Sequence, residues 1–401
     1  MTDTAAVTLP EWARGVEELT LPVSREEMEG RRDAILARMA EEGIDVAVFT
    51  TTQSVIYLTG NQAGGTSAQN RLVLSASGEH RFVVRKIDSL WEGVWAGQNW
   101  VNNWHVYRDE HGSDEATADA VRAVHPGPVR RLGLELNRQS ISYDSVRKIV
   151  SLAGAEDVVS STALVEDLRV IKSDAEVALM RQAGKISCKA SDALVDALRQ
   201  GATDVEAAAA AQMVIMAEGG LHAPQEPYVF SGPAGETGHI PWMRTAPRPG
   251  EVTTWFLSGV TRQYASPIER TVLRLPDTNG VAALVDSVVQ AVESLVDRLR
   301  PGMTSAEAYQ IALDTHRQNG LEKYFPNHAG YSIGIHWPEF ALFRLRAGDR
   351  RVIKSGMAFH LVPLLVVPGI GCICASRAIV VKDDGVELLN DYPLRVEAFE
   401  R

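Results

Sequence analysis

Residues Glu166–Glu176 read EDLRVIKSDAE, and the character of the chain changes across this stretch. Ser173 and Glu176 have the spacing of a capping box, in which two side chains satisfy backbone amides at the start of a helix. The apolar spacing that follows predicts a long helix from Glu176 to about Leu198. The stretch therefore opens a new part of the chain, and we place a domain boundary at about residue 160.

Residues 1–160 alternate between strand-like and helix-like segments. A capping box at Ser24–Glu27 opens a predicted helix that runs to about Glu42, and a second helix is predicted around residues 142–152. Runs rich in β-branched and aromatic residues predict strands at 45–50, 54–60, 71–75, 80–84 and 131–135. This alternation indicates a smaller α/β domain with a largely parallel sheet.

Residues 161–401 group their helices and strands differently. Boxes at Thr203–Glu206 and Thr304–Glu307 open two further helices, and residues 280–299 have the pattern of another. Strands and loops follow each pair of helices, over residues 228–275 and from the last helix to the end. Two such halves predict an α+β domain with helices packed on sheets.

Composition excludes several classes of protein. Of 401 residues, 45% are hydrophobic and 23% charged, which is typical of a globular protein, and 40 basic against 51 acidic residues give a net charge of −11. We therefore expect no nucleic-acid partner. Without a long apolar run or a secretory pattern, we expect a cytoplasmic protein with no membrane partner. We interpret Cys372 and Cys374 as small core residues.

Five blocks follow one another along the chain, namely the EDLRVIKSDAE stretch, Gly238–Arg244, Gly250–Thr271, His328–Gly334 and Gly356–Pro363. In this order they resemble the pita-bread family, which is the M24 peptidase and creatinase family. It includes methionine aminopeptidase, aminopeptidase P, prolidase, creatinase and ectoine hydrolase. The resemblance covers nearly the whole chain and implies a creatinase-type N-terminal domain (1–160), a pita-bread catalytic domain (161–401) and a homodimer.

The peptidases of this family hold two divalent cations with two aspartates, one histidine and two glutamates. The resemblance aligns these ligands with Phe256, Pro267, Tyr331, Val362, and either Ser376 or Ala375. None of these is a usual ligand for such cations. We therefore expect no metal and no other cofactor. The motifs are more similar to the members that work without metal, creatinase and ectoine hydrolase.

Two residues carry the predicted chemistry. The resemblance places Glu269 where creatinase keeps a carboxylate facing the guanidinium of its substrate, and His239 on the catalytic histidine. A carboxylate binds a planar cation through paired charge-assisted hydrogen bonds. A histidine can take a proton from water and return it to the departing nitrogen. We predict metal-independent hydrolysis of a carbon–nitrogen bond in a small amidine or guanidine cation, ectoine-like or creatine-like.

Other polar residues in the same blocks are candidates for substrate binding. The tyrosine that replaces a metal ligand either orients substrate or fills the vacated space, and two of the histidines either touch substrate or belong to the core. The candidates are Tyr331, His328, His360, Tyr264, His336 and Glu339.

Several alternatives stay open at this point. Glu269 could pair with Arg270 or Arg274, and the backbone could satisfy His239. The same site could serve a cyclase or lyase in a biosynthetic pathway, or the chain could be an inactive pita-bread module that binds a peptide or protein. The joint retention of His239 and Glu269 favours an enzyme.

Overall fold

The computed structural model describes residues 21–61, 70–89, 91–95, 97–136, 141–219, 225–238, 240–326, 328–339, 341–395 and 397–400. Backbone contacts divide the chain into two units, Met1–Arg169 and Val170–Arg401. The first ends with α6 (Thr162–Arg169), which packs on α1 (Arg25–Glu42) and α2 (Thr52–Thr59). The division thus falls after α6, whereas the predicted boundary near residue 160 precedes it.

The first unit contains a six-stranded sheet of order β4-β3-β2-β1-β5-β6. The β1–β5, β5–β6 and β3–β4 pairs are parallel, whereas β1–β2 and β2–β3 are antiparallel, so the sheet is mixed rather than largely parallel. The helices α4 (Ser113–Val124) and α5 (Tyr143–Ala153) pack on it through an apolar cluster. Its strands are β1 (Val46–Phe49), β2 (Arg71–Ser75), β3 (His80–Arg85), β4 (Trp104–Tyr107), β5 (Arg131–Leu134) and β6 (Asp157–Ser160).

One predicted strand of this unit is a helix. Residues 54–59 belong to α2, whose first turn is capped by Thr51, which accepts a bond from the Ser54 amide at 3.1 Å. The carboxylate of Glu135 also accepts the Thr51 amide at 2.7 Å, which favours a helix N-terminus there. Gly60, in the left-handed region at φ 70°, ends the helix. Caps and a buried partner from another strand override the β-propensity of the segment.

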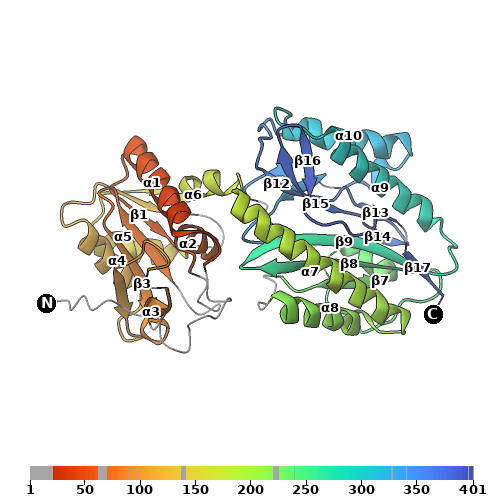
Figure 1. The fold of residues 1–401 in the computed structure, drawn as a ribbon, viewed down its shortest axis with the longest axis horizontal. Coiled ribbons are helices and arrows are strands. Elements are labelled where there is room, and N and C mark those ends of the chain that lie inside the picture. Colours follow the sequence, from red (N-terminus) through yellow and green to blue (C-terminus); the bar gives the residue numbers. More distant parts are fainter. Residues whose placement is uncertain are drawn as a thin grey trace. The chain divides into compact units, whose positions relative to one another are not determined.

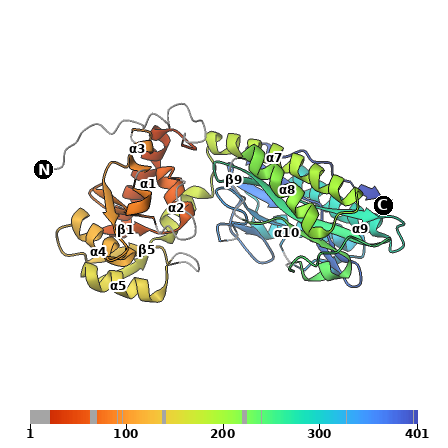
Figure 2. The same cartoon turned by 90° about the horizontal axis from the view of Figure 1, so that it is seen from below.

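The second unit has its helices in two pairs, as the sequence predicts. Capping boxes form at Ser173 and Thr304, at the starts of α7 (Asp174–Arg199) and α10 (Ser305–Gln318). The other members of the two pairs are α8 (Asp204–Gly219) and α9 (Val281–Arg298). Helices α7 and α8 lie side by side against β8 and β9 (Figures 1 and 2), while α9 and α10 pack against the other sheet.

The strands of the second unit form two main sheets. One has the order β17-β9-β8-β7 and the other β11-β10-β12-β15-β16, while β13 and β14 form a separate ribbon. Their bounds are β7 (Tyr228–Ser231), β8 (Val252–Thr261), β9 (Tyr264–Arg274), β10 (Gly330–Ser332), β11 (Arg344–Leu345), β12 (Ala358–Leu361), β13 (Leu365–Val367), β14 (Gly371–Ile373), β15 (Arg377–Lys382), β16 (Gly385–Leu388) and β17 (Glu397–Phe399). Two halves of helices on sheets confirm the α+β prediction. In the described parts of the chain, no helix is long and apolar enough to cross a membrane.

The contact between α7 and β8 sets a strict limit on side-chain size. A methyl group at Gly259 would lie 2.4 Å from the Ala183 carbonyl oxygen and 2.7 Å from the Ser187 amide nitrogen, both backbone atoms. By contrast, a methyl group at Gly30, exposed on α1, would have no atom within 4 Å. The backbones of α7 and β8 therefore touch only because residue 259 has no side chain.

Replacement of each of these two glycines by alanine should have opposite effects on the free energy of unfolding. Gly259→Ala should lower the free energy of unfolding by about 1–3 kcal/mol, because α7 must move away from β8. Gly30→Ala should raise it by about 0.5–1 kcal/mol, because alanine is the better helix former. Urea unfolding followed by circular dichroism measures both, and a Gly259→Ala protein as stable as the parent would contradict the close contact.

Candidate active site

A long hairpin carries Glu269, the predicted catalytic carboxyl group. Strands β8 and β9 pair antiparallel, with Phe256 opposite Glu269. Their connection is the two-residue turn of Arg262 and Gln263, both at positive φ (50° and 71°), which is the hairpin turn that matches strand twist. Every residue of β9 before Arg274 is buried, and Glu269 is only 4% exposed. The hairpin thus holds a carboxyl group deep inside the second unit.

The other main sheet brings two more predicted residues together. In the β10–β12 pair, Tyr331 lies directly opposite His360. An isolated bridge between Arg270 and Ala375 joins β9 to the segment that leads into β15, and the Glu269 amide donates to Ser376 Oγ at 2.8 Å. The two sheets therefore meet at Glu269.

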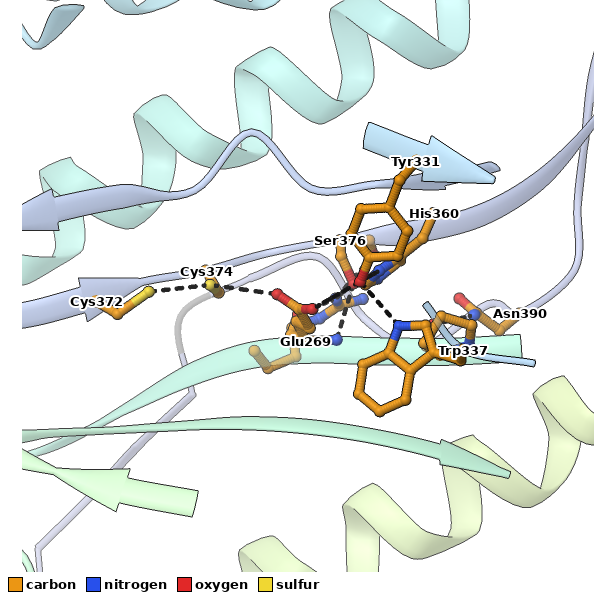
Figure 3. A network of polar contacts seen from close by, with 10 residues as sticks. Glu269, Tyr331, Trp337, His360, Cys372, Cys374, Ser376 and Asn390 are labelled. Carbon is orange, nitrogen blue, oxygen red and sulfur yellow. Dashed lines mark hydrogen bonds and ion pairs between the residues drawn. The ribbon is translucent and has the colours of Figure 1, made fainter. Parts of the chain in front are cut away.

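The hydroxyl group of Tyr331 is the centre of a buried polar network (Figure 3). It lies 3.3 Å from Glu269 Oε1 and 2.8 Å from His360 Nδ1. The indole of Trp337 donates to it at 2.8 Å. His360 Nδ1 is also 3.7 Å from Glu269 Oε1. One carboxyl, one phenol, one imidazole and one indole from four segments thus share a single hydrogen-bond network.

Burial makes the members of this network neutral near pH 7. It raises the pKa of Glu269 to about 8, although hydrogen bonds from Tyr331 and Cys374 act in the opposite direction. The pKa of His360 falls well below its ordinary value, mainly through burial and then through Arg270 and His328. Burial also raises the pKa of the Tyr331 phenol. The contact of His360 with Glu269 therefore joins a neutral imidazole to a carboxylic acid rather than two ions.

A pair of thiols adjoins the carboxyl group. Cys374 Sγ lies 3.7 Å from Glu269 Oε2 and 3.5 Å from Cys372 Sγ. Both cysteines are buried, which agrees with their interpretation as core residues. The spacing of two between Cys372 and Cys374 places their side chains on one face of an extended segment. The contact of Cys374 with Glu269 was not predicted from the sequence.

His328 lies against the same network. Its ring centroid is 5.2 Å from that of Tyr331 in an edge-on arrangement of 76°. Burial, together with the nearby charge of Arg344, lowers the pKa of His328 to about 4, so this imidazole is also neutral near pH 7. Of the predicted site residues, Glu269, Tyr331, His360 and His328 are therefore brought together.

The remaining candidates lie elsewhere or outside the described residues. Tyr264 donates to Glu176 Oε1 at 2.8 Å and so ties the start of β9 to α7. Glu339 lies 3.7 Å from Lys172 Nζ, and both are buried. His336 is half-buried in the segment between β10 and β11. The predicted base His239 lies outside the described residues, and its role stays a prediction.

Two residues of the network were not candidates in the sequence analysis. Trp337 fixes the orientation of the Tyr331 hydroxyl group, and Ser376 accepts the amide of Glu269. The only sequence signal for Trp337 is its place between Tyr331 and Glu339, two residues that were candidates. The resemblance aligns Ser376 with a metal-ligating glutamate of the family. In this chain its hydroxyl group instead accepts a hydrogen bond from the backbone amide of Glu269.

The positions aligned with the family's metal ligands do not fit a pair of divalent cations. Phe256, Pro267 and Val362 have no donor atom in their side chains, and Phe256 and Val362 are buried. The hydroxyl groups of Tyr331 and Ser376 are engaged within the network. Among the described residues, no three His, Cys, Asp or Glu side chains are grouped to hold a metal ion. Such cations need several anionic or imidazole ligands, which these positions do not supply.

Comparison with known proteins identifies the family. Residues 178–383 match the model of metallopeptidase family M24, and residues 31–171 match the creatinase/prolidase N-terminal domain. The chain therefore belongs to the M24 family of hydrolases. Its second unit is the pita-bread domain of that family and follows a creatinase-type N-terminal domain, as the sequence predicts.

Individual relatives cover between 65% and 94% of the chain and differ in activity. Ectoine hydrolase of Halomonas elongata is 25% identical, over 94% of this chain and 98% of its own. An Xaa-Pro dipeptidase of Pyrococcus furiosus is 23% identical, over 65% and 73%. The crystal structure of a dipeptidase from Pyrococcus horikoshii has a TM-score of 0.81 at 22% identity, over 92% and 99% of the two chains. The last likeness concerns the fold alone.

The raised pKa of Glu269 predicts how stability depends on pH. Because the folded protein keeps this proton up to about pH 8 and the unfolded chain loses it near pH 4.5, stability falls as pH rises between these values. The limiting slope for this one group is on the order of 1.4 kcal/mol per pH unit. Glu269→Gln should therefore stabilise the protein at pH 8 relative to the parent, and much less at pH 5.

Urea unfolding of both proteins at several pH values measures this difference. A Glu269→Gln protein whose stability runs parallel to that of the parent from pH 5 to pH 8 would show that Glu269 is already ionised in the folded state.

Proposed function

We propose that the protein is a metal-independent hydrolase that cleaves a carbon–nitrogen bond in a small amidine or guanidine cation. The observation that carries this proposal is the buried carboxyl group of Glu269, which lies beside His360 and beside Tyr331, a residue that the family resemblance aligns with a metal ligand. The relationship to ectoine hydrolase, whose substrate is a cyclic amidine, supports the same substrate class.

The proposed reaction depends on the positive charge of the substrate. A planar amidinium or guanidinium can place two N–H groups against one carboxylate, a charge-assisted pairing that is strong at a buried site. Once Glu269 is ionised, such a cation replaces its proton as the positive partner. The bound carbon stays electrophilic because the substrate keeps its own charge, which offsets the lack of a Lewis acid.

Hydrolysis then needs a group that moves protons. Water adds to the amidine carbon and gives up a proton, a carbon–oxygen bond forms, the carbon–nitrogen bond breaks, and the departing nitrogen takes a proton. We propose His239 for both transfers, since its place beside the Gly250–Thr271 block matches the catalytic histidine of creatinase. Among the substrate-binding candidates, Tyr331, His328 and His360 belong to the Glu269 network, and Tyr264, His336 and Glu339 are retained as outer candidates.

The proposal also includes the oligomeric state and the cellular location of the protein. We propose a homodimer, as the family resemblance implies, acting on a small-molecule substrate in the cytoplasm. Neither a nucleic acid nor a membrane is proposed as a partner, in keeping with the net charge of −11.

A turnover assay on chelator-treated protein tests the reaction. Nuclear magnetic resonance follows ectoine, 5-hydroxyectoine, creatine and an Xaa-Pro dipeptide, with the metal content measured on the same sample. We expect hydrolysis of an amidine or guanidine without bound metal, and at least a hundredfold loss in His239→Ala and Glu269→Gln. Dipeptide cleavage that depends on added metal would contradict the proposal, and conversion without net addition of water would favour a cyclase or lyase.

Binding of a simple cation tests the role of Glu269 separately. Acetamidinium should bind about tenfold more tightly for each pH unit from 6 to about 8, and then level off, because one proton leaves Glu269 for each cation bound. Calorimetry in two buffers of different ionisation enthalpy counts that proton. Glu269→Gln is the matched control and should not bind. Affinity that does not change across this range would rule out exchange of a proton for the cation.

A further inference from the structure

Three groups among the described residues lie within hydrogen-bonding distance of the Tyr331 hydroxyl group, and three such bonds are as many as a phenol forms. A phenol offers one proton and two acceptor positions. Trp337 Nε1 can only donate, and it occupies one acceptor position at 2.8 Å. One proton and one acceptor position remain for Glu269 Oε1 and His360 Nδ1. Of these two groups, one must therefore donate to Tyr331 and the other must accept from it.

This rule allows two arrangements with a neutral imidazole. In the first, Glu269 is a carboxylic acid that donates to Tyr331, Tyr331 donates to His360 Nδ1, and the imidazole proton is on Nε2. In the second, Glu269 is a carboxylate that accepts from Tyr331, His360 donates from Nδ1, and Nε2 has a lone pair. The ionisation of the carboxyl group and the tautomer of the imidazole are thus tied together through one phenol.

We propose that these three residues form a proton relay, in which ionisation of Glu269 delivers a proton at Nε2 of His360 and leaves that atom a proton acceptor. The acid O–H bond of Glu269 breaks as its proton moves to the oxygen of Tyr331. The proton of Tyr331 moves to Nδ1 of His360, and the proton on Nε2 leaves to water. One proton leaves in total, and no electrons are exchanged.

The position of Nε2 supports its role as the end of the relay. His360 is fully buried, and within the described parts of the chain Nε2 has no hydrogen-bond partner. A buried polar atom without a partner is costly, so such atoms in folded proteins usually have a function or hold a water molecule. Nε2 therefore remains available for a proton acceptor from solvent or substrate.

The groups around His360 disfavour a stable imidazolium cation at this position. Arg270 on β9 and His328 before β10 both lower the pKa of His360, so an imidazolium cation at this place is short-lived. Cys374 faces the other carboxyl oxygen of Glu269 and itself has a raised pKa, so it stays a neutral thiol. Among the described residues, the network thus contains no second group that would hold the proton near neutral pH.

The relay extends the proposed function, since the cation that ionises Glu269 is the substrate class proposed above. A substrate that binds to Glu269 would then switch His360 Nε2 from donor to acceptor, in addition to the two proton transfers assigned to His239. In this view, His360 positions a proton for the reaction and is not only a residue of the packed core.

The tautomer of His360 can be observed directly, without substrate or turnover. Two-bond proton–nitrogen correlation spectra of protein with ¹⁵N-labelled histidine distinguish a protonated Nε2 from a protonated Nδ1, and His360→Asn assigns the signal. From pH 6 to 10, we expect His360 to change from the Nε2–H to the Nδ1–H form near pH 8, where Glu269 ionises, and to stay neutral throughout. A single tautomer over the whole range, or titration to an imidazolium, would overturn the relay.

Two conservative variants test the linkage itself. In Tyr331→Phe the tautomer should no longer follow pH, because the bridge is gone. In Glu269→Gln the tautomer should also be independent of pH, because an amide does not ionise in this range. A parent-like change in either variant would overturn the relay. Addition of acetamidinium at pH 7 should cause the same change in the parent; if pH does so and the cation does not, the relay stands and the proposed cation site fails.

Discussion

The structure of the site depends on one constraint, the cost of keeping a carboxyl group in the interior. Glu269 is 4% exposed, and a buried carboxylate without a cation loses the hydration that would stabilise its charge. The protein meets this cost by leaving Glu269 protonated near pH 7, with the uncharged side chains of Tyr331 and Cys374 beside it. A carboxyl group prepared in this way binds strongly only what can replace its proton, namely a cation.

The fold makes that arrangement rigid. The β8–β9 hairpin fixes the position of Glu269, the β10–β12 pair places Tyr331 opposite His360, and Ser376 ties the two sheets together. At the positions that the family resemblance aligns with metal ligands, side chains such as Phe256 and Val362 provide packing instead of donors. The same sheet framework can therefore present either metal ions or a buried acid, depending on a few side chains.

The sequence predicts much of the fold and several residues of the candidate site, and the predictions that fail do so for physical reasons. Capping boxes and apolar spacing predict α7 and α10, and the aligned blocks single out Glu269, Tyr331 and His360 as candidates for the site. Residues 54–60 were predicted as a strand because local propensity cannot register Glu135, which is distant in sequence and satisfies the amides at the start of α2. The contacts of Trp337 with Tyr331 and of Cys374 with Glu269 are made from connecting segments outside the strands and have no periodic signal.

The central claim is that Glu269 is a carboxylic acid in the free protein at neutral pH. Infrared difference spectroscopy between the parent and Glu269→Gln at pH 7 tests it most directly, because a protonated carboxyl group has a carbonyl stretch well separated from the bands of a carboxylate. We predict a protonated carbonyl band that is present in the parent, is lost in the variant and disappears from the parent when acetamidinium is added. A carboxylate band for Glu269 in the free protein would contradict the account.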